Sequence, residues 1–255
     1  MPLLSNDAAL SVSETFVSIQ GEGKLAGVPS LFIRLSGCNL RCSWCDTPYA
    51  SWNPESDPRS IDELVTLAKG ASVRHAVLTG GEPMLFPGLC ELSSRLGTPR
   101  DDGGAGMHIT IETAGTVIPS APPWTLRCDL MSISPKLANS TPRNDPRDPG
   151  GTWAARHEQR RLNPGVIQTL MDRARNTGAE FQLKFVVCTE RDVAEIESLL
   201  SKLRGWTPSD VLIMPEGVAT PSPERREMLA RICLQRAWRY CPRLHIELFG
   251  NRRGT

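Results

Sequence analysis

Short apolar runs that alternate with longer amphipathic stretches constrain the fold of this chain more than any other feature of its sequence. The runs are rich in β-branched residues and read as buried strands at residues 31–35, 76–79, 108–111, 130–133, 181–187 and 211–214. A further run at 244–248 would add a seventh strand. Because parallel strands are joined by long crossovers, the alternation predicts a mostly parallel sheet, either open or closed into a barrel.

Amphipathic stretches with helical spacing occupy the intervals between these runs, at residues 61–69, 166–176, 193–203 and 224–238. Ser60 is a plausible N-cap for the first, with Glu63 as its capping-box partner, and Gly178 can terminate the second. Residues 137–164 lack periodicity and are rich in Pro, Arg, Asp and Asn, so we interpret them as a long surface loop, which is functional or mobile. The 255 residues otherwise fit one domain, 1–255.

Charge and composition exclude several classes of partner. The 29 basic and 28 acidic residues give a formal net charge of +1, which does not favour nucleic-acid binding and leaves a small molecule as the expected ligand. The N-terminal residues 1–7 lack the pattern of a secretion signal, and no apolar run approaches the ~18 residues of a membrane span. We therefore expect a cytoplasmic protein, in which the eight cysteines stay reduced.

Three cysteines, Cys38, Cys42 and Cys45, cluster directly after the first expected strand. Thiolates suit zinc or an iron–sulfur cluster, and structural zinc normally takes four protein ligands. Three thiolates on a four-iron cluster would leave one iron open to a small molecule. The alternatives are a zinc site completed by a distant histidine, or chance clustering of core thiols. The remaining cysteines are expected to act as small buried hydrophobes: Cys90, Cys128, Cys188, Cys233 and Cys241.

Two further motifs end expected strands. The sequence Thr-Gly-Gly-Glu-Pro occupies residues 79–83, and Ser134-Pro135-Lys136 follows the fourth run. Because the C-terminal ends of parallel strands share one end of a barrel, these motifs should meet the cysteines there, and glycines let a backbone approach a ligand closely. An ordinary strand-to-helix turn would also fit residues 79–83. Lys184 either points into the barrel or reaches solvent at the surface.

With Trp44 before the third cysteine, the C-x3-C-x2-C spacing resembles the radical S-adenosylmethionine (SAM) superfamily. That resemblance implies an α/β fold, an incomplete (β/α)6-type TIM barrel with a possible extra C-terminal strand. It also implies that the three cysteines hold a [4Fe-4S] cluster whose open iron binds SAM. The residues that would contact SAM are Trp44, Cys45, Asp46, Gly81, Glu82, Ser134, Pro135 and Lys136.

Finer motifs narrow the resemblance. The Q-G-E-G sequence at 20–23, Arg34 four residues before Cys38, and Asp46-Thr47 after the cluster are together similar to the 7-carboxy-7-deazaguanine synthase family. That family carries out a Mg²⁺-dependent lyase reaction of 7-deazapurine and queuosine biosynthesis, in which 6-carboxy-5,6,7,8-tetrahydropterin becomes 7-carboxy-7-deazaguanine with loss of ammonia. The resemblance further implies a homodimer and an external flavodoxin- or ferredoxin-like electron donor.

The same resemblance assigns substrate and metal contacts. Thr47 would bind Mg²⁺, although a threonine after an aspartate is also a common helix cap. The substrate contacts would be Ile19, Gln20, Gly21, Glu22, Arg34 and Thr79. Q-G-E-G alone could be a surface turn, and Thr79 is unremarkable in a strand. Arg34 lies within an apolar run, so it either has a buried partner or reaches the surface.

The chain also departs from the family pattern. Its loop at 137–164 is longer than in compact members, and its last residues, 247–255, lack the Q-x-H element that helps other members bind substrate. His245 does not match that spacing, so no C-terminal contact is assigned. Two rival functions share some of these motifs: an activase that installs a glycyl radical on a partner enzyme, and a non-catalytic zinc-binding module. The paired Q-G-E-G and Asp46-Thr47 motifs disfavour the activase.

Overall fold

The computed structural model describes residues 9–99, 104–119 and 125–255. Residues 1–7, where the sequence shows no secretion signal, lie outside the described ranges. Among the described residues, no helix is long and apolar enough to cross a membrane.

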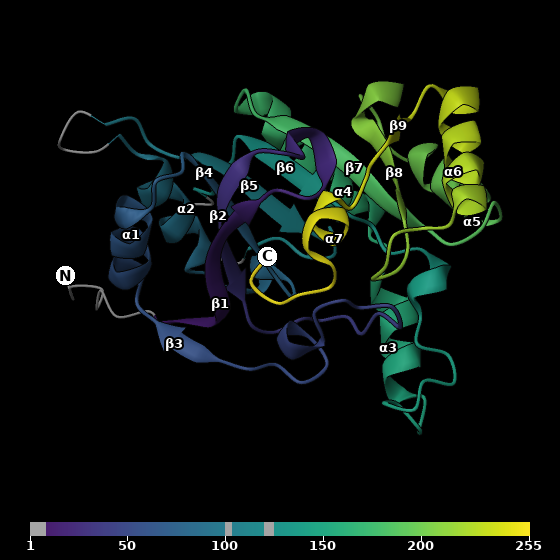
Figure 1. The fold of residues 1–255 in the computed structure, drawn as a ribbon, viewed down its shortest axis with the longest axis horizontal. Coiled ribbons are helices and arrows are strands. Elements are labelled where there is room, and N and C mark those ends of the chain that lie inside the picture. Colours follow the sequence, from purple (N-terminus) through teal and green to yellow (C-terminus); the bar gives the residue numbers. More distant parts are fainter. Residues whose placement is uncertain (1–8, 100–103, 120–124) are drawn as a thin grey trace.

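One sheet of nine strands forms the body of the molecule, in the order β3-β1-β2-β4-β5-β6-β7-β8-β9 (Figure 1). Neighbouring strands from β2 to β9 are parallel, whereas β1 is antiparallel to both β2 and β3. The strands are β1 (Leu10–Ile19), β2 (Pro29–Leu35), β3 (Asp57–Arg59), β4 (His75–Gly80), β5 (His108–Thr113), β6 (Leu130–Ile133), β7 (Glu180–Val187), β8 (Val211–Pro215) and β9 (Arg239–Tyr240). All six expected strands are present, and the sheet does not close, which confirms the partial barrel.

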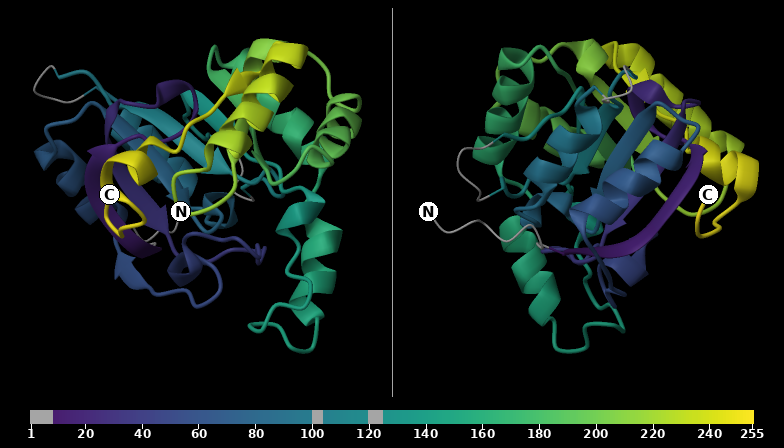
Figure 2. Two further views of the ribbon diagram at one scale, coloured as in Figure 1. Left: turned by 45° about the vertical axis from the view of Figure 1, so that its right-hand side comes forward. Right: turned by 90° about the vertical axis from the view of Figure 1, so that its left-hand side faces the viewer.

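Most of the helices cover the outer face of the parallel strands, whereas the helix at 152–160 projects away from the sheet and the helix at 244–249 packs against the turn after β1 (Figures 1 and 2). The helices are α1 (Ile61–Gly70), α2 (Leu89–Gly97), α3 (Thr152–Arg160), α4 (Pro164–Asn176), α5 (Asp192–Leu200), α6 (Pro223–Arg236) and α7 (Leu244–Phe249). The 3-10 turns are η1 (Gly23–Leu25), η2 (Pro48–Ala50), η3 (Pro83–Leu85), η4 (Ala138–Ser140) and η5 (Pro208–Asp210). Outward-facing strand residues such as Ile33, Leu78 and Leu183 are fully buried in the main core.

The local signals for α1 and α4 are confirmed. Ser60 Oγ accepts from the backbone N–H of Glu63 at 3.2 Å, and Glu63 Oε2 accepts from the N–H of Ser60 at 2.8 Å, so the capping box is complete. Gly178 lies just beyond α4 with φ of 75°, a conformation that favours glycine.

Two expectations are wrong. Residues 244–248 form most of helix α7 rather than a strand; the short strand at this end of the sheet is β9, and Ile246 is the buried residue of the helix. Residues 137–164 are not a plain surface loop, because they contain η4 and α3 and bury His157 completely. The apolar pattern did not predict helix α3, because its buried face carries a histidine and not an aliphatic side chain.

Strands β1 and β3 were also absent from the sequence-based expectation. In β1 the apolar alternation is interrupted, since the register with β2 shifts between Val12 and Glu14. Strand β3 has three residues and only pairs with β1. Together they extend the barrel by an antiparallel edge, which carries Glu14 and Phe16 to the same cavity as the parallel strands.

Candidate active site

A cavity of about 680 Å³ opens at the carboxyl ends of the parallel strands, within the range of ordinary small-molecule sites, about 300–1,000 Å³. It brings together the cysteine loop, the end of β4, the turn after β1 and the segment after β9. The sequence-predicted residues that line it are Ile19, Gln20, Gly21, Glu22, Arg34, Cys38, Cys42, Trp44, Cys45, Asp46, Thr47, Thr79, Gly81, Ser134 and Lys136. Glu82 and Pro135, also predicted, do not line it.

The three cysteines of the cluster loop, residues 38–45, all face this cavity. Cys38 Sγ accepts from the backbone N–H of Leu40 at 3.3 Å, and Cys45 Sγ lies 3.2 Å from Ser51 Oγ. Burial raises the pKa of the Cys38 thiol to about 12 and also raises that of Cys42. The free thiols of Cys38 and Cys42 would therefore stay protonated, and binding of a metal would release their protons.

The chemistry of these three thiols suits a [4Fe-4S] cluster. In the described part of the chain, no three His, Cys, Asp or Glu side chains are placed to share one metal ion. A [4Fe-4S] cluster does not require such convergence, because each thiolate binds a different iron. Such a cluster requires soft thiolate donors, hydrogen bonds to sulfur adjust its potential, and the adjoining cavity gives room for a ligand of the open iron.

The Gly-Gly-Glu-Pro turn after β4 is packed against the backbone of the cluster loop. A Cβ on Gly81 would lie 2.3 Å from the carbonyl oxygen of Gly37, and one on Gly80 would lie 2.2 Å from that of Leu35. A side chain at either position would collide with the backbone of the cluster loop or of β2, so packing within the protein already requires these glycines, whether or not a ligand approaches them. Glu82 is fully buried and accepts from Thr113 Oγ1 and from the N–H of Ala114, each at 2.8 Å, so it holds the turn in place.

The Q-G-E-G sequence follows β1 and is not a surface turn. Gln20 is buried, and its Nε2 donates to Glu112 Oε1 at 3.3 Å. Gly21 is in direct contact with α7, since a Cβ there would lie 1.9 Å from Nδ1 of His245. The backbone carbonyl of Gly21 also accepts from the N–H of Leu244 at 2.9 Å. This turn therefore depends on a helix more than two hundred residues later in the chain.

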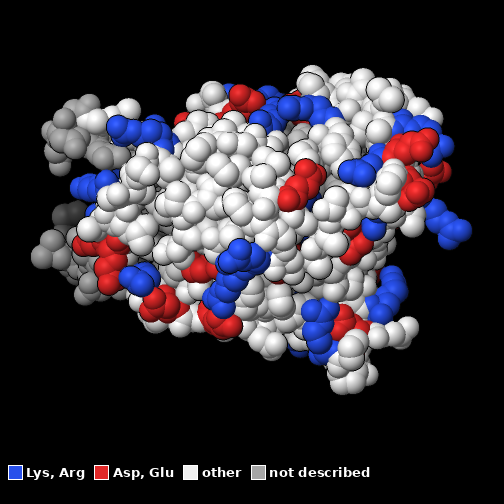
Figure 3. Space-filling view, viewed as in Figure 1, with Lys and Arg blue, Asp and Glu red and all other residues white. Residues whose placement is uncertain are grey.

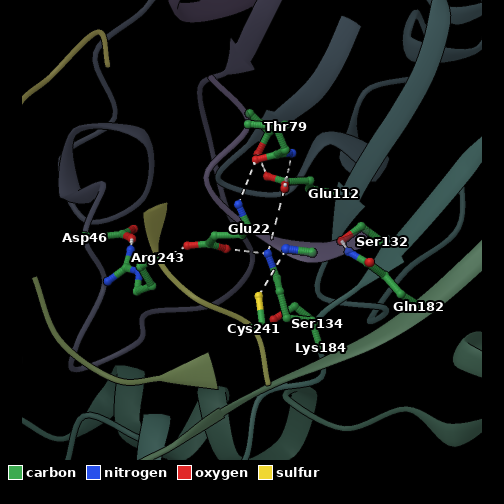
Figure 4. A network of polar contacts seen from close by, with 12 residues as sticks. Glu22, Asp46, Thr79, Glu112, Ser132, Ser134, Gln182, Lys184, Cys241 and Arg243 are labelled. Carbon is green, nitrogen blue, oxygen red and sulfur yellow. Dashed lines mark hydrogen bonds and ion pairs between the residues drawn. The ribbon is translucent and has the colours of Figure 1, made fainter. Parts of the chain in front are cut away.

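A network of charged side chains crosses the cavity (Figure 4). Lys184 Nζ lies 2.5 Å from Glu22 Oε2 and 3.8 Å from Glu112 Oε1. Arg243 pairs with Glu22 at 3.1 Å and with Asp46 on the cluster side. Glu22, a predicted substrate residue, and Asp46, a predicted SAM residue, thus share one guanidinium.

Glu22 and Lys184 are kept ionised by the opposite charges around them. Burial alone would raise the pKa of Glu22, but Lys184 and Arg243 outweigh it and hold that pKa well below its ordinary value. Burial alone would lower the pKa of Lys184, but Glu22 and Glu112 outweigh it and raise that pKa. Glu22 therefore presents a fixed negative charge and Lys184 a fixed positive charge at neutral pH. Lys184 points into the barrel, which resolves the alternative left open by the sequence.

Arg34 has the buried partner that its position required. Its Nε donates to Glu14 Oε1 at 2.7 Å, and the hydroxyl of Tyr49 donates to the same oxygen at 2.8 Å. Arg253 contacts the other carboxylate oxygen at 3.3 Å and stacks over the Tyr49 ring at 4.1 Å. Burial raises the pKa of Tyr49 to about 12. Arg34 lines the cavity, and among the described residues its only hydrogen bond is the one from Nε to Glu14, so its two terminal nitrogens can serve a ligand there.

The opposite wall carries the residues predicted to contact SAM. Trp44 Nε1 donates to Asn139 Oδ1 at 3.2 Å, and Lys136 Nζ donates to Ser134 Oγ at 2.9 Å and lies 5.7 Å from the centre of the Trp44 ring. Thr47 occupies the N-cap position of η2, yet its side chain makes no capping hydrogen bond. A capping role therefore does not explain Thr47.

Several cavity residues were not found by sequence reasoning. They are chiefly polar inward-facing residues of β1 and β5 and the segment after β9: Glu14, Glu112, Thr113, His245, Asn251, Arg252 and Arg253. Glu112 could have been found, because a carboxylate in an apolar strand requires partners. The C-terminal segment gives no such signal.

The outer surface viewed in Figure 3 bears acidic and basic side chains interspersed with large uncharged areas. Apart from the cavity, two smaller hollows of about 280 and 220 Å³ lie among other elements. Neither is lined by any of the residues that the sequence singled out as site candidates. The candidate site is therefore the large cavity.

Comparisons with known proteins agree with these features. Residues 32–156 match the model of the radical SAM superfamily. The chain is 43% identical to the 7-carboxy-7-deazaguanine synthase of Rhodopirellula baltica, over 98% of the chain and 91% of the relative, and 42% identical to that of Halobacterium salinarum, over 95% and 91%. The crystal structure of QueE from Escherichia coli has the same fold, with a TM-score of 0.60 at 23% identity, covering 91% of this chain and 93% of that one.

Proposed function

The chain belongs to the 7-carboxy-7-deazaguanine synthase family of the radical SAM superfamily, and from this premise we propose that it converts 6-carboxy-5,6,7,8-tetrahydropterin to 7-carboxy-7-deazaguanine with loss of ammonia. It is a radical SAM enzyme of the queuosine pathway, which uses SAM and a [4Fe-4S] cluster. The observation that carries the proposal is the single cavity shared by the cluster loop, the Gly-Gly-Glu-Pro turn and the Q-G-E-G turn.

One wall of the cavity would hold the cluster and SAM. Cys38, Cys42 and Cys45 would bind three irons, and the bound cluster would supply the electron that cleaves SAM to give the 5′-deoxyadenosyl radical. Contacts to SAM would come from Trp44, Asp46, Gly81, Ser134 and Lys136, which line the cavity. Glu82 would act indirectly, by fixing the turn that carries Gly81. We assign no direct contact to Pro135.

The facing wall would bind the pterin. Its ring edge presents several donors and acceptors, which the turn from Ile19 to Glu22 and the hydroxyl of Thr79 can satisfy. The free nitrogens of Arg34 suit the substrate carboxylate, because a guanidinium binds carboxylates with two parallel hydrogen bonds. Glu112, Lys184 and His245 join this wall in our proposal because they face the same space.

Thr47 would bind Mg²⁺ together with substrate oxygens and water. Its hydroxyl faces the cavity without a capping bond, and Mg²⁺ commonly takes few protein ligands. The ion would orient the substrate and stabilise its negative charge. We further propose a single domain over 1–255, a homodimer, a flavodoxin- or ferredoxin-like electron donor and a cytoplasmic location, as predicted from the sequence and the family resemblance.

The test is direct. Anaerobically reconstituted enzyme is incubated with SAM, a reductant, Mg²⁺ and the carboxypterin, and the product is identified by mass spectrometry. We expect 7-carboxy-7-deazaguanine from the wild type and none from Cys42→Ala, which retains two thiols. Cluster-loaded wild type that cleaves SAM but yields no deazaguanine would refute the substrate assignment and leave the radical SAM assignment standing.

A further inference from the structure

The cluster loop has no regular secondary structure, so other parts of the protein must fix its backbone. The N–H of Arg41 donates to His157 Nδ1 at 3.2 Å, and the N–H of Ser43 donates to the carbonyl of Ser140 at 2.9 Å. The carbonyl of Ser43 accepts from Arg147 at 2.8 Å. These three partners of the loop backbone come from one segment, about a hundred residues later. They lie within residues 137–164, which the sequence alone predicts to be a surface loop.

His157 is the centre of these contacts. It is fully buried. A backbone N–H can only donate, so Nδ1 of His157 must accept from Arg41, and the ring proton must then lie on Nε2. Nε2 is 2.8 Å from Ser140 Oγ, which in turn donates to the carbonyl of Leu137 at 2.6 Å. His157 therefore joins the peptide that precedes Cys42 to the turn that holds Ser43.

Two arginine–tryptophan stacking contacts also hold the cluster loop. The Arg41 guanidinium donates to the carbonyl of Cys38 at 2.8 Å and lies 4.1 Å from the centre of the Trp153 ring on α3. Arg147 lies 4.1 Å from the centre of the Trp52 ring. Trp52 Nε1 also donates to the carbonyl of Cys42 at 3.0 Å. The segment thus contacts the loop through both main-chain groups and side chains.

We propose that residues 137–161 form a clamp that positions the cluster loop, and that His157 is its central positioning residue. The inference rests on the proposed function, since it requires that the three cysteines hold a cluster. Groups that orient the ligands of a metal centre affect its affinity for the metal, and hydrogen bonding around the sulfurs affects the potential of a cluster. Loss of the clamp should therefore change the cluster itself, and not only the stability of the fold.

Three substitutions separate the functions of the two ring nitrogens. His157→Asn keeps an acceptor at the δ position, where it can face the N–H of Arg41. His157→Gln places its amide at the ε position, toward Ser140, and loses the acceptor for Arg41. His157→Phe fills the volume and removes both. The matched control is His75→Phe, because His75 is another buried histidine held between two hydroxyls, Ser30 Oγ at 2.6 Å and Thr110 Oγ1 at 2.7 Å, and it does not line the cavity.

The measurements are made on anaerobically reconstituted, full-length protein. They are iron and sulfide per chain, the rate at which a ferrous chelator removes iron, and the electron paramagnetic resonance spectrum and midpoint potential of the reduced cluster with and without SAM. We expect His157→Phe and His157→Gln to lose iron about tenfold faster than the wild type and to show altered spectra. His157→Asn and His75→Phe should stay close to the wild type in both respects.

The outcomes are distinct. A wild type that binds a cluster while His157→Phe and His157→Gln retain iron and spectra unchanged would overturn the clamp and leave the proposed function intact. Equal iron loss from His75→Phe and His157→Phe would also overturn it, because general destabilisation would then explain both. If the phenylalanine variant does not fold, the comparison of Asn with Gln decides, and equal behaviour of that pair rejects the inference. A wild type without iron would remove both proposals.

Discussion

Replacement of Lys184 by Met tests whether the charged network of the cavity is a coupled unit. The side chain is 6% exposed, and its nitrogen lies 2.5 Å from Glu22. Removal of one partner from a buried ion pair costs about 3–5 kcal/mol. Arg243 still neutralises part of the Glu22 charge from 3.1 Å, so we expect the lower end, about 3 kcal/mol. For a chain of this size that corresponds to a fall in Tm of about 6–12 °C.

The assay is thermal unfolding of anaerobically reconstituted protein, followed by tryptophan fluorescence. Lys184→Met, Glu22→Gln and the double variant form a thermodynamic cycle. The double variant should be less destabilised than the sum of the single variants by about 1.5 kcal/mol or more, or about 3–6 °C in Tm. Arg59→Met is the control, because its pair with the exposed Asp57 lies at the surface and its loss should leave the Tm close to that of the wild type.

The dependence on pH gives a second criterion. The pKa of Glu22 is lowered from 4.5, so its contribution is complete above that value and is lost only as the pH falls through the folded-state pKa. The pKa of Lys184 is raised from 10.5, so its contribution is complete below that value and is lost as the pH rises through the folded-state pKa. The Tm difference between wild type and Lys184→Met should therefore be constant between about pH 6 and about pH 9. Additive single variants, within about 0.5 kcal/mol, would refute the coupling.

Further predictions concern other parts of the site and the barrel. Arg34→Lys should raise the KM for the carboxypterin about 10- to 100-fold, because the two-pronged contact to its carboxylate is lost; an unchanged KM argues against that contact. Thr47→Val should raise the Mg²⁺ concentration for half-maximal rate about tenfold, whereas Thr47→Ser should not. The same Mg²⁺ requirement in both variants would exclude the Thr47 hydroxyl as a Mg²⁺ ligand. Cys42→Ala should lack the cluster absorbance near ~400 nm that makes the protein brown, whereas Cys90→Ala should retain it. Loss of this absorbance from both variants would indicate a general folding defect instead. Burial lowers the pKa of His75 from 6.5 to about 4, so as the pH falls the unfolded chain binds the proton before the folded chain does. The free energy of unfolding of the wild type should therefore fall by about 2 kcal/mol between about pH 7.5 and about pH 5, a loss that His75→Gln does not show.

The strands and the cluster motif were predictable because their signals are local. Each parallel strand, such as β4 or β7, is a short apolar run, and the three thiols of the cluster loop lie within eight positions. The capping box at Ser60 likewise depends on residues three apart. Wherever neighbouring residues determine the conformation, the sequence was sufficient.

The sequence-based predictions that were wrong concern segments whose structure is determined by contacts with distant residues. Residues 244–248 have an apolar pattern short enough to suit a strand or a helix, and α7 forms where Gly21 leaves room for His245. Helix α3 has few aliphatic residues, and its buried group is His157, which bonds to Arg41. Neither partner can be identified from the local sequence. The Gly-Gly-Glu-Pro turn shows the same limit, because Gly81 is required by the backbone of Gly37.

The clamp contacts also bear on how the protein is made. The hydrogen bond from Arg41 to His157 joins residues 116 apart, and the ion pair between Glu22 and Arg243 joins residues 221 apart. A growing polypeptide therefore exposes its three thiols on the ribosome well before the groups that hold them in place have been synthesised. During that interval the thiols are open to oxidation or to capture of the wrong metal. The clamp is complete only when residues 137–161 have been made, so we expect the loop to hold a cluster stably only after their synthesis.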